Sequence, residues 1–523
     1  MEFKDINELE KATKRGRRES LRLGVGLIFV VCVMLFSSLI DEANGPHGVM
    51  LVVAAMIGGY MAMNIGANDV ANNVGPAVGS RAISMTGAII IAAVFEMAGA
   101  LIAGGDVVAT VQKGIIDPTM IGDTERFIWV MTAALLAGAI WLNIATASGA
   151  PVSTTHSVIG AVLGAGIAAG GVESANWSTL SGIVASWIIS PVMGGVVAAG
   201  FLYWIKRSIT YRDDMVAAAQ RMVPILIGLM AFAFSTYLIL KGLNKVWKVS
   251  VFPAFGIGAA IGLCTYWLLG RSITGKFESL ENSKASINTL FTIPLICAAA
   301  LLSFAHGAND VANAVGPLAA IADAAKSGGI SAKASIPLWV MLVGATGIAI
   351  GLLLYGPKLI RTVGSEITEL DQMRAFCIAM SAALTVIIAS QMGLPVSSTH
   401  IAVGGVFGVG FLREFIKTSY SQMIEEIKQH HEGADKEVVE VFLDRFGKAS
   451  IEEKRLMLER LKAQGAMAEL SKVERKQIRK VYRHELVKRS ALLKIAAAWI
   501  ITVPISGILA ALIYYMIFGM VNA

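Results

Sequence analysis

Two short polar motifs each occur twice in an otherwise apolar chain, and they carry the residues that could do chemistry. GANDVAN begins at Gly66 and again at Gly307, an offset of 241 residues. GAPVSTTHSVIG at 149–160 is matched by GLPVSSTHIAVG at 393–404, an offset of 244. Two unrelated motifs in the same order at nearly the same spacing indicate an internal duplication.

The GANDVAN copies place acids and amides beside apolar segments. The acids are Asp69 and Asp310, and the flanking amides are Asn68, Asn72, Asn309 and Asn313. An ionised carboxylate inside a bilayer costs ~2.5–3.5 kcal/mol on insertion scales, and by default it marks an ion pathway. Carboxylate and amide oxygens are hard ligands that suit Na⁺ and other hard cations. These six residues therefore form a predicted cation-binding set, to which Gly66 and Gly307 could add backbone carbonyls by letting the helix unwind.

A third acid, Glu96 in IAAVFEMAGA, lies inside an apolar segment and is predicted to join the same network. The alternative for each aspartate is an ion pair with a basic residue on a neighbouring helix. Arg81 could pair with the first copy, but no basic residue lies at the matching place in the second.

The second motif, PVSTTH or PVSSTH, follows an apolar segment that ends in glycine. Proline disfavours helix in the preceding residue, so a helix should end there and another begin at the Ser/Thr run. A helix N-terminus at membrane depth attracts anions, because its free N–H groups and its dipole point at the ligand. The hydroxyls predicted to add donors for a small tetrahedral oxyanion are Ser153, Thr154, Thr155, Ser397, Ser398 and Thr399. The alternative is a purely structural capping role, which recurrence in both halves makes less favoured.

Three histidines lie beside these motifs: His156, His400 and His306. Each could relay protons near neutral pH, or could be a neutral side chain held by a backbone carbonyl. An enzyme with a Ser/His centre is disfavoured, because neither motif contains a third, orienting acid.

The elements that must position these residues are membrane helices. Of 523 residues 55% are hydrophobic and 15% are charged, and the mean hydropathy is +0.66, whereas a soluble chain has about 25% charged residues. Apolar runs near the ~20 residues needed to span a bilayer recur throughout. We predict an all-α polytopic membrane protein of about 12 transmembrane segments. The four cysteines lie inside apolar segments and are read as buried hydrophobes.

The charge pattern gives an orientation and an organisation. Basic residues before the first apolar run and a basic, amphipathic block near the C-terminus are both expected in the cytoplasm. Duplicated halves are typical of secondary transporters. The predicted units are a basic N-terminus (1–21), an extra helix (22–40), a first transport repeat (50–204), linking helices (205–287), a second repeat (288–412), the cytoplasmic block (413–490) and a last transmembrane helix (491–519).

The doubled GANDVAN with the doubled PVS(T/S)TH resembles the PiT family of inorganic phosphate transporters, of bacterial type, over most of residues 50–412 and the last helix. The resemblance implies two inverted repeats with broken helices and re-entrant helical hairpins. It also implies secondary active import of phosphate, in some bacteria as a metal–phosphate complex, across the inner (plasma) membrane with Na⁺ or H⁺, and neither enzymatic activity nor a cofactor. By the same resemblance the six hydroxyls would bind phosphate. The GANDVAN polar residues would bind the coupling cation or support the substrate site, and Glu96 would match a functional glutamate.

Three features depart from the family pattern. Na⁺-coupled members have a glutamate where this chain has Ala379, which leaves the coupling ion open between Na⁺ and H⁺. The helix before the first GANDVAN and the place of the polar block also differ from mammalian members.

Other assignments stay open beside phosphate transport. A sulfate permease could use the same scaffold, and an anion channel would not need Asp69 and Asp310. Nucleic acid is not expected as a partner, and homodimer formation is left open.

Overall fold

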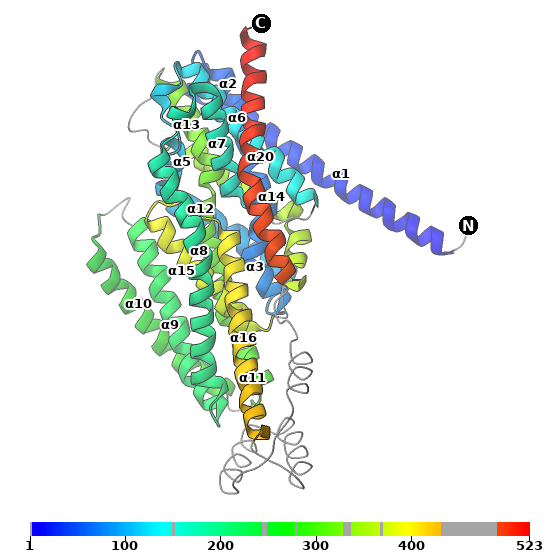
Figure 1. The fold of residues 1–523 in the computed structure, drawn as a ribbon, viewed down its shortest axis with the longest axis vertical. Helices are drawn as coiled ribbons and strands as arrows, with labels where there is room; N and C mark the ends of the chain where they lie inside the picture. The colour runs from blue at the N-terminus through cyan, green and yellow to red at the C-terminus, as the bar shows by residue number, and fades with distance from the viewer. Residues whose placement is uncertain are drawn as a thin grey trace.

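The computed structural model describes residues 3–148, 152–242, 248–277, 280–327, 336–366, 370–429 and 489–522. All named elements in these ranges are helices (Figure 1). The α-helices are α1 (Phe3–Ser38), α2 (Gly48–Asn68), α3 (Val70–Gly79), α4 (Met85–Ala103), α5 (Gly105–Lys113), α6 (Thr124–Ser148), α7 (Thr154–Gly170), α8 (Trp177–Ile205), α9 (Met215–Lys241), α10 (Val251–Phe277), α11 (Lys284–Leu290), α12 (Thr292–Asp310), α13 (Ala312–Ser327), α14 (Leu338–Glu366), α15 (Gln372–Gln391), α16 (Ser398–Gln429) and α20 (Arg489–Asn522).

Within the described ranges, twelve helical segments are long and apolar enough to cross a membrane. The predicted class and the expected number of spans are therefore confirmed. One apolar helix is shorter: α7 has 17 residues and follows a hairpin turn. Because the helices of this bundle expose large apolar side chains on their outer faces, lipid is the solvent that suits this surface.

Both GANDVAN copies interrupt a membrane helix by a single residue. Asp69 joins α2 to α3, and Val311 joins α12 to α13. The idea that Gly66 and Gly307 unwind the helix is wrong, because both lie inside helical segments. A Cβ on Gly66 would lie 1.9 Å from the Ile348 carbonyl oxygen, and one on Gly307 would lie 2.1 Å from that of Glu96. The glycines are required because neighbouring backbones approach closely there.

The two Pro-Val-Ser segments lie at the turns of two helical hairpins. Val152 and Ser153 are non-helical before α7 begins, and in the second hairpin a turn at Met392–Gly393 and the non-helical residues Leu394–Ser397 separate α15 from α16. Helix therefore stops before Pro395 and resumes at the hydroxyl run, as predicted; Pro151 is outside the described residues. In Figure 1, α6–α7 lies in the upper part of the molecule and α15–α16 in the lower part. An inverted relation between two whole repeats stays a prediction.

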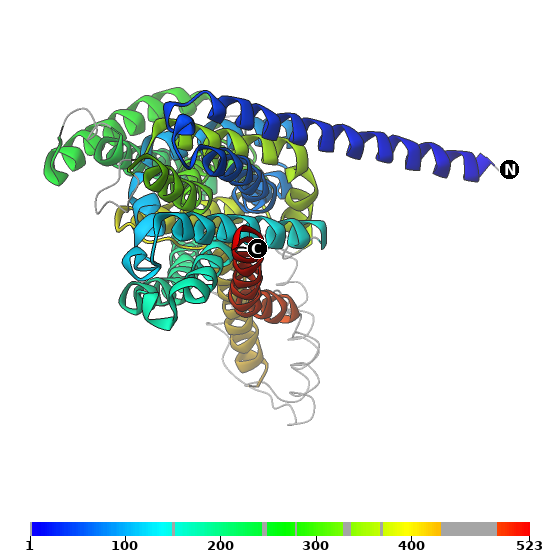
Figure 2. The ribbon, with the colours of Figure 1, turned by 90° about the horizontal axis from the view of Figure 1, so that it is seen from above.

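The helices of the two halves interlock. Helix α14 packs on α2 and α3, α12 packs on α4 and α15, and the last helix α20 packs on α6 and α7. Figure 2 shows α1 extending away from the rest of the bundle. Helix α16 continues to Gln429 and so extends into the predicted cytoplasmic block (413–490), and α20 begins at Arg489, just before the predicted end of that block. Residues 430–488 of that block lie outside the described residues.

The crossing of α8 and α16 gives a test of the packing. A Cβ on Gly408 would lie 2.0 Å from the Gly195 carbonyl oxygen, and backbone atoms in a packed helix cannot move aside. We expect Gly408→Ala to lower the free energy of unfolding by about 1–3 kcal/mol, the usual cost of overpacking. Thermal unfolding in detergent measures it. The control is Gly200→Ala in α8, where nothing lies within 4 Å of the added Cβ; equal stability of the two variants would contradict the prediction.

Candidate functional site

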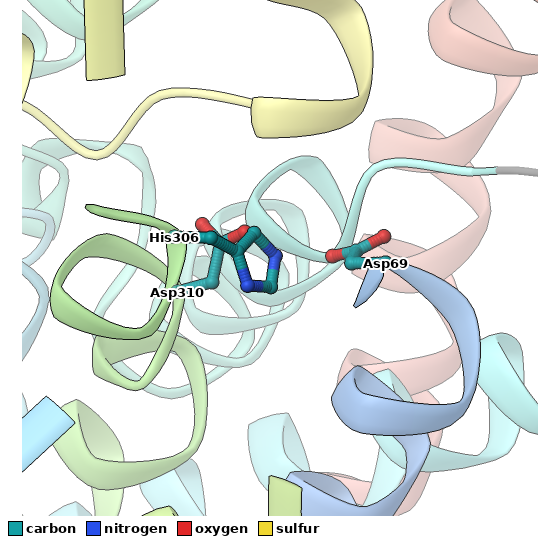
Figure 3. A group of neighbouring side chains, drawn as sticks. All are labelled: Asp69, His306 and Asp310. Carbon is teal, nitrogen blue, oxygen red and sulfur yellow. The ribbon is translucent and has the colours of Figure 1, made fainter. Parts of the chain in front are cut away.

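The two interrupted helices bring the motif acids together inside the protein. Figure 3 shows Asp69 at the α2–α3 junction facing His306 and Asp310 of α12. All three are buried, and one potential ligand atom from each lies within 4.8 Å of the other two. The duplicated motif therefore forms one site and not two separate ones.

The hairpin turns supply hydroxyls to these acids. The Ser153 and Ser397 hydroxyl oxygens accept the backbone N–H of His156 and His400, three residues on, and so cap α7 and α16. The next residue in each hairpin binds the acid of its own half. Thr154 donates to Asp69 Oδ2 at 2.5 Å.

The second hairpin repeats this contact, since Ser398 donates to Asp310 Oδ2 at 2.7 Å. The same relation therefore occurs once in each half. All four side chains of these two contacts are buried.

A second set of bonds crosses between the halves. Asn72 donates to the Thr399 hydroxyl at 2.8 Å, and Asn313 donates to the Thr155 hydroxyl at 3.1 Å. Thr399 also donates to Asp69 Oδ1 at 3.1 Å. Each GANDVAN segment therefore contacts the hairpin of its own half and the hairpin of the other.

The first asparagine of each motif has a different role from the second. Asn68 donates to the Thr146 hydroxyl and Asn309 to the Ser390 hydroxyl, both at 2.9 Å. Thr146 and Ser390 lie near the ends of α6 and α15, just before the hairpin turns. These asparagines tie each hairpin to its interrupted helix through their amide nitrogens.

Glu96 lies in the same cluster as the two aspartates, and one of its partners, Asn73, was not among the residues predicted from the motifs. Its Oε1 accepts from the Asn73 amide at 2.6 Å. The sequence held a sign of this contact. Asn73 follows the first GANDVAN, whereas Ala314 follows the second, so the extra amide occurs in the first copy alone. His306 Nδ1 lies 2.7 Å from Glu96 Oε2, and its Nε2 lies 2.6 Å from Asp310 Oδ2, off the direction of a good hydrogen bond. His306 thus contacts carboxylates and not the backbone carbonyl considered above.

The other two histidines lie apart from the acids. The rings of His156 and His400 meet edge to face with centroids 4.4 Å apart, and each also packs on a tryptophan, His156 on Trp187 and His400 on Trp499. None of their ring nitrogens completes a hydrogen bond within the described residues. They form a direct contact between the two hairpins.

The ion pair between Asp69 and Arg81 is not formed. Arg81 is exposed in the turn after α3, whereas Asp69 is buried and accepts from two hydroxyls. Ala379, at the place of the family glutamate, is buried in α15. Ala379 therefore supplies no carboxylate, and the side chain of the second half that contacts Glu96 is the imidazole of His306.

Several buried oxygens fit a bound cation. Asn68 Oδ1, Asp310 Oδ1 and Asn313 Oδ1 have no hydrogen-bond partner within the described residues. These atoms can only accept, so a buried environment leaves them unsatisfied unless a donor or a cation reaches them. Their chemistry suits a hard cation such as Na⁺.

Two helical hairpins have turns that meet beside buried acids. This arrangement, built from duplicated motifs, is typical of multi-pass membrane transporters. The chain belongs to the Phosphate transporter family, whose family model matches residues 65–510. That family assignment agrees with a non-enzymatic function.

Individual relatives agree with the family. The chain is 54% identical over 525 residues to a Helicobacter pylori protein named "Putative phosphate permease", covering 98% of both chains. It is 39% identical over 363 residues to a permease of the same description from Pyrococcus abyssi, covering 69% of this chain and 89% of that one. A solved structure described as "The sodium-dependent phosphate transporter" matches with a TM-score of 0.73 and 30% identity, covering 90% of this chain and 99% of that chain.

Proposed function

We propose that this protein is a secondary active transporter that imports inorganic phosphate across the inner (plasma) membrane together with Na⁺ or H⁺. Residues 50–204 and 288–412 act as the two transport repeats, related by inversion, with phosphate bound where the hairpin turns meet. The N-terminus and the 413–490 block lie in the cytoplasm, as their basic residues favour.

One observation carries the coupling to a cation: the charge inventory of the site. The buried side chains of the described residues include the acids Asp69, Glu96 and Asp310 but no lysine or arginine. A phosphate anion entering beside these carboxylates would be repelled, since like charges at close range in a low dielectric are costly. A cation that enters with phosphate removes this cost, so uptake of the two is linked.

The residue roles follow from chemistry and position. The phosphate ligands are the hydroxyls at and beside the hairpin turns, assisted by free N–H groups in the first turns of α7 and α16: Ser153, Thr154, Thr155, Ser397, Ser398 and Thr399. The cation ligands are the carboxylate and amide oxygens of the interrupted helices and of α4: Asn68, Asp69, Asn72, Glu96, Asn309, Asp310 and Asn313. Neutral donors suit a transporter, because they release the anion more readily than an arginine clamp would.

Different parts of the site favour the two coupling ions. The unpaired oxygens of Asn68, Asp310 and Asn313 support Na⁺, as does the likeness to a sodium-dependent transporter. The row Glu96–His306–Asp310 supports H⁺, because histidine between two carboxylates can hold and pass a proton. Phosphate as a metal complex is a further form of the substrate.

Uptake into proteoliposomes, with Na⁺ and pH gradients imposed separately, tests this function. We expect labelled phosphate to accumulate above its external concentration under one of the two gradients, and accumulation to stop when an ionophore dissipates that gradient. Labelled sulfate is the matched competitor. Preferential accumulation of sulfate would indicate a sulfate permease instead. Equilibration of labelled phosphate across the membrane, without accumulation under either gradient, would indicate a channel.

A further inference from the structure

The hydroxyls assigned to phosphate are engaged by the protein's own carboxylates. Thr154 and Thr399 donate to the two oxygens of Asp69 at 2.5 and 3.1 Å, and Ser398 donates to Asp310 Oδ2 at 2.7 Å. A hydroxyl has a single proton to donate. None of these three side chains can therefore donate to phosphate while it donates to an aspartate.

One of the three remaining hydroxyls of the set is engaged as well. Thr155 donates to the Val396 carbonyl oxygen at 3.0 Å, on the opposite hairpin. The threonines already accept amide protons as well, since Asn313 donates to both Thr154 and Thr155 at 3.1 Å. Four of the six hydroxyls therefore donate to acceptors within the protein, three of them to the two aspartates, and Ser153 and Ser397 accept backbone N–H groups.

We propose that Asp69 and Asp310 are internal competitors for the phosphate-binding hydroxyls, and that a metal cation bound at these carboxylates releases the hydroxyls to phosphate. The inference rests on the proposed function and adds a mechanism by which binding of the cation promotes binding of phosphate. An ionised acceptor holds a hydroxyl about twice as strongly as a neutral one. A cation on the carboxylates weakens their hold, and the phosphate oxygens then become the stronger acceptors.

The site provides the cation with a place beside the competing oxygens. Asp310 Oδ1 and Asn313 Oδ1 lack partners within the described part of the chain, although both residues are buried. Asp310 Oδ1 belongs to the same carboxylate whose Oδ2 holds Ser398. A cation reaching this free oxygen acts directly on the group that engages the hydroxyl.

The glutamate of the site does not share this property, which gives a matched control. Glu96 is as deeply buried as the aspartates, but its side-chain partners are the Asn73 amide and the His306 ring. Removing its charge would therefore reduce general repulsion without freeing a hairpin hydroxyl.

Equilibrium binding of labelled phosphate to the purified full chain in nanodiscs, at one fixed pH, tests the inference. We expect wild type to bind phosphate at least about tenfold more tightly in NaCl than in choline chloride, the scale of one hydrogen bond to a charged group. The double variant Asp69→Asn/Asp310→Asn keeps the shape of both side chains. It should bind in choline about as tightly as wild type does in Na⁺ and should not respond to Na⁺. Glu96→Gln should stay weak in choline.

Three results would overturn the inference: wild-type affinity that is the same in both salts, a double variant weaker than wild type in choline, or an equal gain in choline by Glu96→Gln. The salt comparison uses the wild-type protein and so does not depend on a variant that folds. No phosphate binding by wild type in either salt, with sulfate bound instead, would overturn the proposed function itself.

Discussion

Asp69→Asn and Asp310→Asn are each expected to lower concentrative uptake steeply while the protein stays folded. Each aspartate is buried, and each receives a hairpin hydroxyl of its own half. The amide keeps the shape and one accepting oxygen but removes the charge that attracts the cation. Uptake against a gradient should fall by about tenfold or more, which corresponds to the loss of only about 1.4 kcal/mol of coupling.

Uptake of labelled phosphate into proteoliposomes measures this effect, with size-exclusion profiles and thermal unfolding as checks on folding. Asp123→Asn is a control, because the Asp123 side chain is exposed and its partners are the Arg126 guanidinium and the Arg126 backbone N–H at the start of α6. Wild-type accumulation by both site variants would show that the acids are structural. Binding that persists without accumulation would agree with the release of hydroxyls proposed above.

Thr155→Val and Thr399→Val are expected to weaken phosphate binding in the presence of the coupling ion by roughly ten- to a hundredfold each, since one hydrogen bond to a charged group is worth ~1.5–3 kcal/mol. Valine keeps the branched shape and removes the hydroxyl. The two residues accept matching amides, Asn313 on Thr155 and Asn72 on Thr399. Because these amide contacts match, the two losses should be similar, although Thr155 donates to the Val396 carbonyl and Thr399 to Asp69.

Equilibrium phosphate binding in nanodiscs gives both affinities beside that of wild type. Cation binding without phosphate should change much less, because its ligands lie mainly in the interrupted helices. Thr346→Val is a control for loss of a hydroxyl inside a span, since the Thr346 hydroxyl bonds only its own helix, at the Leu342 and Val343 carbonyls. Unchanged phosphate affinity in both site variants would mean that the hairpin turns are structural caps.

Features that depend on near neighbours in the chain could be predicted from the sequence. Apolar runs predicted the membrane helices, and the proline rule predicted that helix stops before Pro395 and resumes at Ser398. Ser153 and Ser397 cap their helices because a serine oxygen reaches an N–H three residues on. The doubled motifs predicted that Asp69 and Asp310 have matching roles. Each of these inferences uses local chemistry or an internal comparison.

Other features depended on which helices pack together. The crossed pairs, Asn72 with Thr399 and Asn313 with Thr155, join the two halves of the chain. The role assigned to Gly66 was wrong because it was read as local flexibility, whereas the glycine admits the backbone of α14.

The sequence by itself determined a membrane protein with duplicated polar motifs, two hairpin turns and acids at membrane depth. His306 and Asp310 are one helical turn apart on α12, but tertiary structure alone decided that His306 also contacts Glu96, and that His156 contacts His400 and not an acid. Hydropathy, capping and proline effects act within a few residues, so the chain itself records them. The partner of a buried polar group such as Glu96, which contacts His306 210 residues away, is chosen by helix packing, and no local rule specifies that choice.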